Sequence, residues 1–108
     1  MEKLKTCLPE LRYLFHHLKP AQRLNYVKYG STSLTECLAN LGLNLMYSNK
    51  NGLKLSSSQI KALRKNKSAL LKLIMAKSIQ AQRKALSNKM INLLLTILMN
   101  IADQIETD

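Results

Sequence analysis

Basic side chains are concentrated in one segment of the sequence, and phosphate is the group that such side chains bind best. The segment from Gln59 to Lys89 contains no carboxylate, and after Glu36 the next acid in the chain is Asp103. Solvated protein surfaces normally mix both signs of charge, so a long run of one sign predicts contact with a polyanion. Lysine offers phosphate a point charge, while arginine binds it through two parallel hydrogen bonds. The nine bases of the segment are Lys61, Arg64, Lys65, Lys67, Lys72, Lys77, Arg83, Lys84 and Lys89.

The segment predicts contact with the backbone of a nucleic acid rather than with its bases. Asn66 and Gln82 are candidates for reading base edges, but they lie in no recognised DNA-recognition motif. No aromatic residue lies among the bases, so the segment has no ring on which an unpaired base stacks. Lys67 is a weaker candidate, because it lies near the apolar edge of the predicted helix. We therefore predict sequence-independent binding by Lys61, Arg64, Lys65, Lys72, Lys77, Arg83, Lys84 and Lys89.

Other reactive residue types occur without the spacing that catalysis or metal binding requires. Three of the six carboxylates lie after residue 102, so a general acid–base pair is hard to assemble. The sequence contains no glycine-rich phosphate loop, nucleophile elbow or HExxH pattern. His16 and His17 are adjacent, point about 100° apart on a helix, and do not converge on a metal with Cys7. We expect no enzymatic activity, no metal site and no cofactor.

The net charge of the chain also predicts an anionic partner. Seventeen lysines and arginines against six acids give +11 over 108 residues, and self-repulsion on that scale destabilises a compact monomer. Nucleic acid, an anionic membrane surface or an acidic protein would each supply the counter-charge. Because the chain has two cysteines and no CxxC pair, we expect Cys7 and Cys37 to be reduced and buried. The N-terminal residues lack the apolar run of a signal peptide, so we predict an intracellular, reducing location.

Residues 1–19 predict an amphipathic helix. Apolar residues recur there at spacings of four, three, four and three, which places them on one face: Leu4, Leu8, Leu11, Phe15 and Leu18. Pro9 either lies in the first turn, with Thr6 as the cap, or splits the segment. The helix either closes the bundle or remains peripheral and pairs with another chain.

Two further helices follow in the first half of the chain. Pro20 suits the first position of a short helix, and Gly30 suits its end. Ser33 and Glu36 have the spacing of a capping box, which predicts that a third helix begins at Ser33.

The second half predicts two longer helices. Ser56 and Gln59 begin the first of them with another capping box, and four apolar residues define its buried face: Ile60, Leu63, Leu70 and Ile74. Ser78 is the predicted cap of the last helix, which covers residues 78–107. The predicted fold is therefore all-α, a single domain over residues 1–108 that forms a small bundle of four to five helices.

The last helix contains an apolar run, Met90 to Ala102, that is interrupted only by a narrow polar stripe. A helix of this kind is normally covered by other elements, and the run is shorter than the ~20 residues that span a bilayer. Three interpretations remain open: a central core helix, an oligomerisation helix, or a membrane-active helix beside anionic lipid. The residues predicted to form the core or the oligomer contact are Met90, Leu94, Ile97, Leu98 and Ile101.

Five features occur in order between Pro20 and Lys89. A Glu-Cys-apolar helix, here residues 36–38, is followed by a short polar turn and an L-S-x-x-Q motif at residues 55–59. A Lys/Arg-rich helix and a second basic run, at residues 82–84, come next. In this pattern the chain resembles a group of small basic helical proteins that are encoded by adintoviruses and related Polinton-like elements of animals.

The resemblance implies a viral or transposon-derived protein that acts with DNA or inside a capsid, like the small basic core proteins of adenovirus-type virions. It implies the nucleus of a host cell or the virion as the location, and it transfers no catalytic or binding residues. The sequence departs from the family after residue 86, where the family continues into an apolar tail with Gly-Gly and Pro. Residues 87–108 contain neither glycine nor proline and end in acids, which favours a packed helix over a processed or membrane-lytic tail.

These patterns predict a non-enzymatic protein that binds nucleic acid without sequence preference, of the DNA-condensing or virion-core type. One alternative is a helical oligomerisation or capsid-assembly module, whose partner is a second copy of the chain or a capsid protein. A second alternative is an amphipathic helical protein that associates with membranes.

Overall fold

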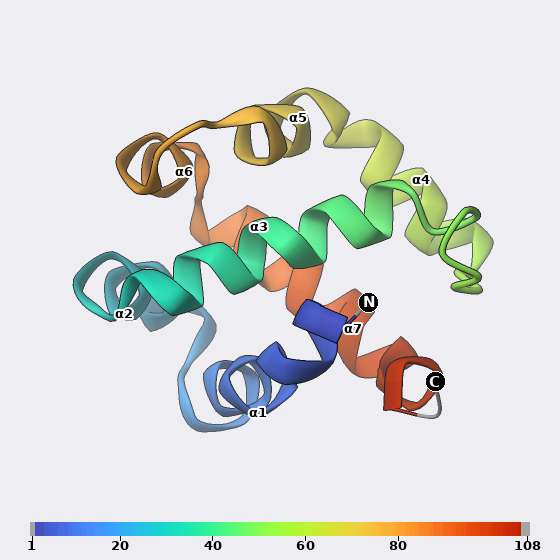
Figure 1. The fold of residues 1–108 in the computed structure, drawn as a ribbon, viewed down its shortest axis with the longest axis horizontal. Helices are drawn as coiled ribbons and strands as arrows, with labels where there is room; N and C mark the ends of the chain where they lie inside the picture. Colours follow the sequence, from blue (N-terminus) through green and yellow to red (C-terminus); the bar gives the residue numbers. More distant parts are fainter. Residues whose placement is uncertain (1, 107–108) are drawn as a thin grey trace.

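All regular secondary structure is helical in the part of the chain that the structure, a computed structural model, describes (Figure 1). This part comprises residues 2–106. It contains seven α-helices, one 3-10 turn (η1) and no strand: α1 (Glu2–His17), η1 (Pro20–Gln22), α2 (Arg23–Tyr29), α3 (Thr32–Met46), α4 (Ser57–Lys65), α5 (Lys67–Met75), α6 (Ile79–Ala85) and α7 (Asn88–Glu106). The all-α prediction is confirmed, but the predicted number of four to five helices is too low.

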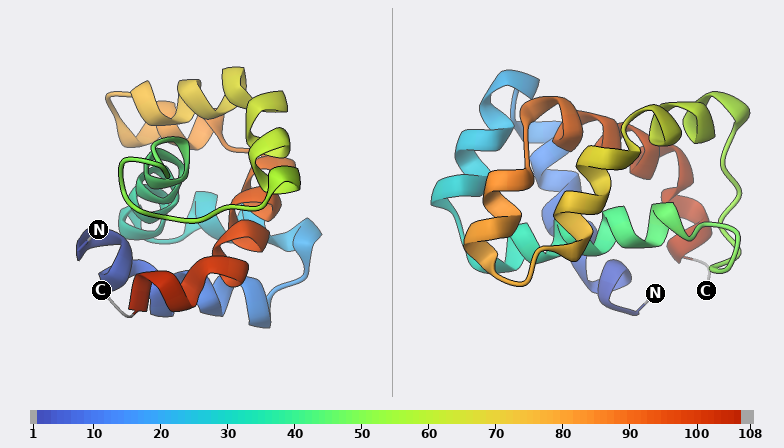
Figure 2. Two further views of the ribbon diagram at one scale, coloured as in Figure 1. Left: turned by 90° about the vertical axis from the view of Figure 1, so that its right-hand side faces the viewer. Right: turned by 90° about the horizontal axis from the view of Figure 1, so that it is seen from above.

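Helix α3 lies between two groups of helices. On one side it packs against α5 and α6, and α4 leads into α5. On the other side it packs against α1, α2 and α7. The turned views in Figure 2 show α4, α5 and α6 as one layer beside α3, with α1 and α7 beyond α3. We refer to residues 57–85 as the α4–α6 layer.

The helix predicted from Ser56 is broken at Asn66. Ser56 forms the predicted capping box: its Oγ accepts the Gln59 N–H at 3.2 Å, and Gln59 Oε1 accepts the Ser56 N–H at 2.8 Å. Asn66 ends α4, and its Nδ2 donates to the Ala62 carbonyl at 2.8 Å. Asparagine competes for backbone groups in this way and therefore favours helix ends. On the predicted apolar face, Leu63 and Leu70 are buried, while Ile60 and Ile74 are half-buried.

The long helix predicted from Ser78 is also broken, at Leu86 and Ser87. Ser78 caps α6, because its Oγ accepts the Ala81 N–H at 3.1 Å. Ser87 Oγ accepts the Met90 N–H, also at 3.1 Å, at the start of α7. Leu86 has an extended backbone and a buried side chain. The axes of α6 and α7 differ by 91°, so α6 stays in the α4–α6 layer while α7 enters the core.

Helix α7 forms the centre of the core. The five residues predicted for a core or oligomer contact are all buried within the single chain: Met90, Leu94, Ile97, Leu98 and Ile101. They belong to one apolar cluster with residues of α1 and α3. Judged by length and apolar composition, no single helix within residues 2–106 could cross a membrane, whereas the bent pair of α6 and α7 together could.

Helix α1 continues through Pro9, so both predictions for this proline are wrong. Pro9 lies exposed inside α1. Thr6 is not a cap, because its Oγ1 donates to the Glu2 carbonyl at 3.0 Å within the helix. An internal proline costs about 3 kcal/mol, and burial of leucines on both sides of it offsets that cost: Leu4, Leu8, Leu11 and Leu14. The helix packs on α3 and α7 and so closes the bundle.

The predicted limits of the second helix are confirmed, but the start of the third is not. The 3-10 turn η1 begins at Pro20, and Gly30 is the C-cap of α2. Helix α3 has already begun at Ser33, so the predicted capping box is wrong. Glu36 instead accepts a hydrogen bond from Lys3 Nζ on α1 at 3.5 Å, because α1 packs along this part of α3.

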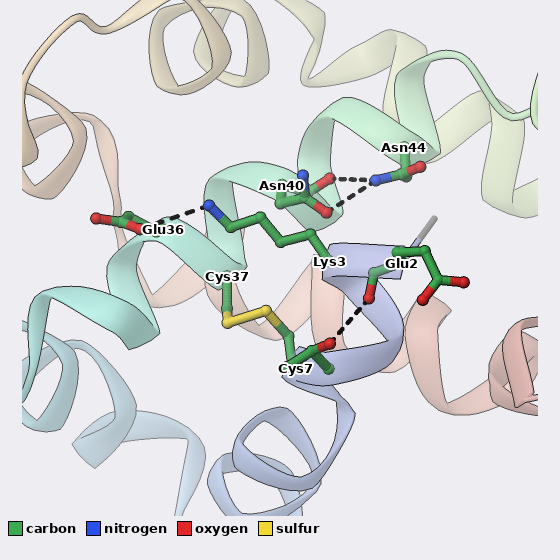
Figure 3. The surroundings of a disulfide bond; sticks show 8 residues. Glu2, Lys3, Cys7, Glu36, Cys37, Asn40 and Asn44 are labelled. Atoms are coloured by element: carbon green, nitrogen blue, oxygen red, sulfur yellow. Dashed lines mark hydrogen bonds and ion pairs between the residues drawn. A yellow bond between two sulfur atoms is a disulfide. The ribbon is translucent and has the colours of Figure 1, made fainter.

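Cys7 and Cys37 form a disulfide bond, which corrects the prediction of two reduced thiols (Figure 3). The packing of α1 on α3 brings their Cα atoms to 5.7 Å, within the range that a disulfide bridges. Both cysteines are buried, and Figure 3 shows the ion pair of Lys3 and Glu36 beside them. Disulfides persist in oxidising environments, so the bond does not fit the reducing part of the predicted location, whereas the intracellular part stays a prediction.

Arg23, the first residue of α2, is buried and joins three helices. Its Nε and one terminal nitrogen donate to the carbonyls of Leu14 and Phe15 at 3.1 and 2.8 Å, in the last turn of α1. The other terminal nitrogen donates to Asn92 Oδ1 on α7 at 2.8 Å. Burial lowers the pKa of Arg23, whereas the partial negative charge of a helix C-terminus favours a cation there. No pattern in the sequence singles out this residue.

We expect Arg23→Lys to lower the free energy of unfolding by about 1–2 kcal/mol. A single ammonium group cannot reach three separate acceptors, so at least one buried oxygen loses its partner. Chemical denaturation measures the change. The matched control is Arg64→Lys, at an exposed position, which should change stability by less than about 0.5 kcal/mol. Equal unfolding midpoints for the two variants would show that the Arg23 bonds add nothing.

Candidate nucleic-acid interface

The α4–α6 layer carries charge of one sign only. It contains eight bases and no carboxylate. The other nine bases share the rest of the chain with all six acids, so the layer has a formal charge of +8 and the remaining residues have +3, out of the total of +11. The layer packs on α3 through α5 and α6, and its opposite side forms the outside of the molecule (Figures 1 and 2).

Seven of the eight bases of the layer are exposed and available. None of the seven forms a hydrogen bond or an ion pair with another residue between 2 and 106. No internal bond must therefore break before phosphate binds. Lys67, the weaker candidate in the sequence, is exposed like the others. The seven are Lys61, Arg64, Lys65, Lys67, Lys72, Lys77 and Lys84.

Two predicted binding residues have a different position or role. Arg83 is half-buried, and its Nε donates to Thr35 Oγ1 at 3.3 Å while a terminal nitrogen donates to the Gly30 carbonyl at 3.2 Å. These bonds hold α6 against the junction of α2 and α3, so Arg83 has fewer donors left for phosphate than predicted. Lys89 is exposed in the first turn of α7, beyond the break and outside the layer.

The carboxylates of the described residues lie on α1, α3 and α7, and two of them are neutralised there. Lys3 pairs with Glu36 across α1 and α3. Arg12 on α1 pairs with Glu106 on α7. These two ion pairs join α1 to α3 and to α7, and no carboxylate lies on the α4–α6 layer to compete with phosphate.

Each of the two candidate base readers has one amide atom that is not available to a ligand. The Nδ2 of Asn66 is occupied by the Ala62 carbonyl at the bend between α4 and α5. The Oε1 of Gln82 is buried and has no hydrogen-bond partner among the described residues. The arrangement therefore favours contact with phosphate over base recognition.

An apolar groove of about 600 Å³ lies beside the layer, and no pattern in the sequence predicts it. It runs between the C-terminal end of α3, the turn that follows and the bend of α4 and α5. Leu45, Leu63 and Leu70 contribute to its apolar lining, and Arg64 and Lys67 contribute the charge. The groove exists because Asn66 bends the basic segment, a feature that the helical pattern does not reveal.

The described residues 2–106 contain no group of three or more His, Cys, Asp or Glu side chains that could hold a metal ion. No protein-family model, curated protein or solved structure matches the chain. The resemblance to the proteins of adintoviruses and Polinton-like elements therefore rests on the sequence motifs alone.

Proposed function

We propose that the chain is a non-enzymatic nucleic-acid-binding protein that contacts the phosphate backbone through the α4–α6 layer. The observation that carries the proposal is the segregation of charge: eight bases and no acid on one layer, with seven bases exposed and unpaired among residues 2–106. Phosphate contacts position a protein on nucleic acid without reading its sequence. Of the two amides that could have read bases, Asn66 donates to the Ala62 carbonyl and Gln82 has a buried Oε1.

The size of the layer suits several phosphate contacts. It runs along the longest axis of the molecule, which is horizontal in Figure 1 and measures 32 Å. Duplex DNA carries about one charge per 1.7 Å of its axis, so a duplex of that length carries roughly 19 phosphates on all its sides. The seven free bases can therefore find phosphates even where only one side of the duplex faces the layer.

A salt titration tests the proposal directly. If about five phosphates are neutralised, the logarithm of affinity for random-sequence duplex DNA should fall against the logarithm of salt concentration with a slope of roughly −4 to −5. Fluorescence anisotropy at a series of salt concentrations gives the slope, and the affinity should be similar for unrelated sequences. Absence of binding at low salt would refute the proposal.

Within this proposal, the protein is of the DNA-condensing or virion-core type, derived from a virus or a transposon. The order of motifs between residues 36 and 84 supports this part. The Cys7–Cys37 bond favours the virion over the nucleus as the place where the protein resides, because nuclear proteins are kept reduced whereas virions carry disulfides.

Assembly with an acidic protein, such as a capsid protein, is a second candidate that the apolar groove supports. A segment with apolar side chains flanked by carboxylates would match the groove and the two bases, Arg64 and Lys67, that line it. Light scattering on the samples of the salt titration separates the candidates. A stable oligomer in samples that bind no DNA would favour assembly over nucleic-acid binding as the function.

A further inference from the structure

Three aromatic side chains from α1 and α2 form a cluster on the surface. The ring centroid of Tyr13 lies 4.8 Å from that of His17, with 24° between the planes, and 5.9 Å from that of Tyr26, with 40° between the planes. Tyr13 and Tyr26 are 46% and 43% exposed. We refer to Tyr13, His17 and Tyr26 as the aromatic platform.

The platform borders a pocket of about 280 Å³ whose lining suits a flat ring with a polar edge. Tyr13, Tyr26 and Leu34 contribute ring and apolar surface, while Ser31 contributes a hydroxyl group. Glu10 also lines the pocket. Its carboxylate repels phosphate but accepts N–H groups such as those on base edges. The pocket therefore favours a base over a phosphate group.

The pocket begins where the α4–α6 layer ends. Gly30 lines the pocket, and its carbonyl accepts the hydrogen bond from Arg83 on α6 at 3.2 Å. A nucleic-acid strand whose backbone follows the layer toward α6 thus reaches the junction of α2 and α3, where the platform lies.

We infer that the aromatic platform is a stacking site for an unpaired nucleobase, so that the protein binds single strands through base stacking as well as through phosphate. This inference rests on the proposed function and extends it. In a duplex each base is already stacked between its neighbours, whereas an unpaired base has a free face for an aromatic ring. Stacking of this kind tolerates any sequence because every base has such a face.

Two oligonucleotides with equal phosphate charge test the inference: oligo-dT and an abasic strand of the same length. We expect the full-length protein to bind oligo-dT at least about tenfold more tightly, the effect of stacking one base. Tyr26→Leu should abolish this preference and leave the affinity for the abasic strand unchanged, while Tyr26→Phe should keep the preference. The chain has four tyrosines and no tryptophan, so quenching of tyrosine fluorescence reports stacking directly.

Tyr47→Leu is the matched control. Tyr47 is 47% exposed and contacts Lys50, but it lies at the other end of α3, a helix of 15 residues and about 22 Å in length. The control should keep the preference for oligo-dT. Circular dichroism confirms that each variant remains folded, and an oligo-rU strand run in parallel shows whether ribose or deoxyribose strands are preferred.

The possible results distinguish failure of the stacking site from failure of the proposed function. Equal affinity for oligo-dT and the abasic strand, with duplex binding intact, would overturn the stacking site and leave backbone binding in place. An equal loss in Tyr47→Leu and Tyr26→Leu would also overturn it. Failure of every strand and of duplex DNA to bind would overturn the proposed function together with the inference.

Discussion

Reversal of two charges on the α4–α6 layer, by Arg64→Glu with Lys65→Glu, is expected to weaken binding to duplex DNA about a hundredfold at 0.1 M salt. Each phosphate contact contributes roughly 0.9 log units of affinity at 0.1 M salt relative to 1 M, through the release of counterions. Loss of two contacts accounts for roughly a sixtyfold decrease on this basis, and repulsion between the new carboxylates and phosphate adds to it. The slope against salt should become shallower by about two.

The control for this experiment has the same net charge but leaves the layer intact. Lys19 and Lys28 are exposed and lie outside residues 57–85. Lys19→Glu with Lys28→Glu lowers the net charge from +11 by four, as the layer variant does, and should reduce affinity for duplex DNA only a few-fold. Equal losses in the two variants would mean that net charge alone drives binding and that the interface is placed wrongly.

Helix caps could be predicted from the sequence because a cap is a local structure. Ser56 and Ser78 each accept the N–H three residues later, as their spacing predicts. Ser33 has the same signature but lies inside α3. There the packing of α1 on α3 turns Glu36 toward Lys3 instead.

The two helix breaks could not be predicted because they depend on tertiary packing. The helical period continues through Asn66 and Leu86, so the pattern predicts unbroken helices. Burial of the Leu86 side chain and the turn of 91° that follows bring α7 into the core. Burial of the apolar face of α7 there outweighs the loss of the few backbone hydrogen bonds at the break.

Like the fold, the candidate site has some features that the sequence predicts and others that depend on tertiary packing. The bases of the layer could be named from composition, and seven of them are exposed and unpaired within residues 2–106. The internal use of Arg83 and the proximity of Tyr13 to Tyr26 depend on how α6, α1 and α2 pack, which no local pattern specifies. The apolar groove beside Arg64 likewise results from the bend at Asn66.

Reduction of the Cys7–Cys37 bond is expected to lower the free energy of unfolding by about 3–4 kcal/mol. The bond joins residues that are 30 apart in sequence, and the chain-entropy model gives a stabilisation of this size for a loop of that length. For a domain of about 100 residues, the loss corresponds to a decrease of roughly 15–25 °C in the midpoint of thermal unfolding. Unfolding followed by circular dichroism, with and without reductant, measures both quantities.

The variant Cys7→Ala with Cys37→Ala supplies the control, since it should unfold near the reduced protein and should not respond to reductant. Two titratable thiols in protein purified without reductant would contradict the bond. The closed loop ends in α3, before the α4–α6 layer begins. Reduced protein that is still folded should therefore keep its affinity for DNA. If the reduced protein lost its affinity for DNA at temperatures well below its unfolding midpoint, the bond would be needed to position the layer. The reason would be that α3, which the bond joins to α1, is the helix on which α5 and α6 pack.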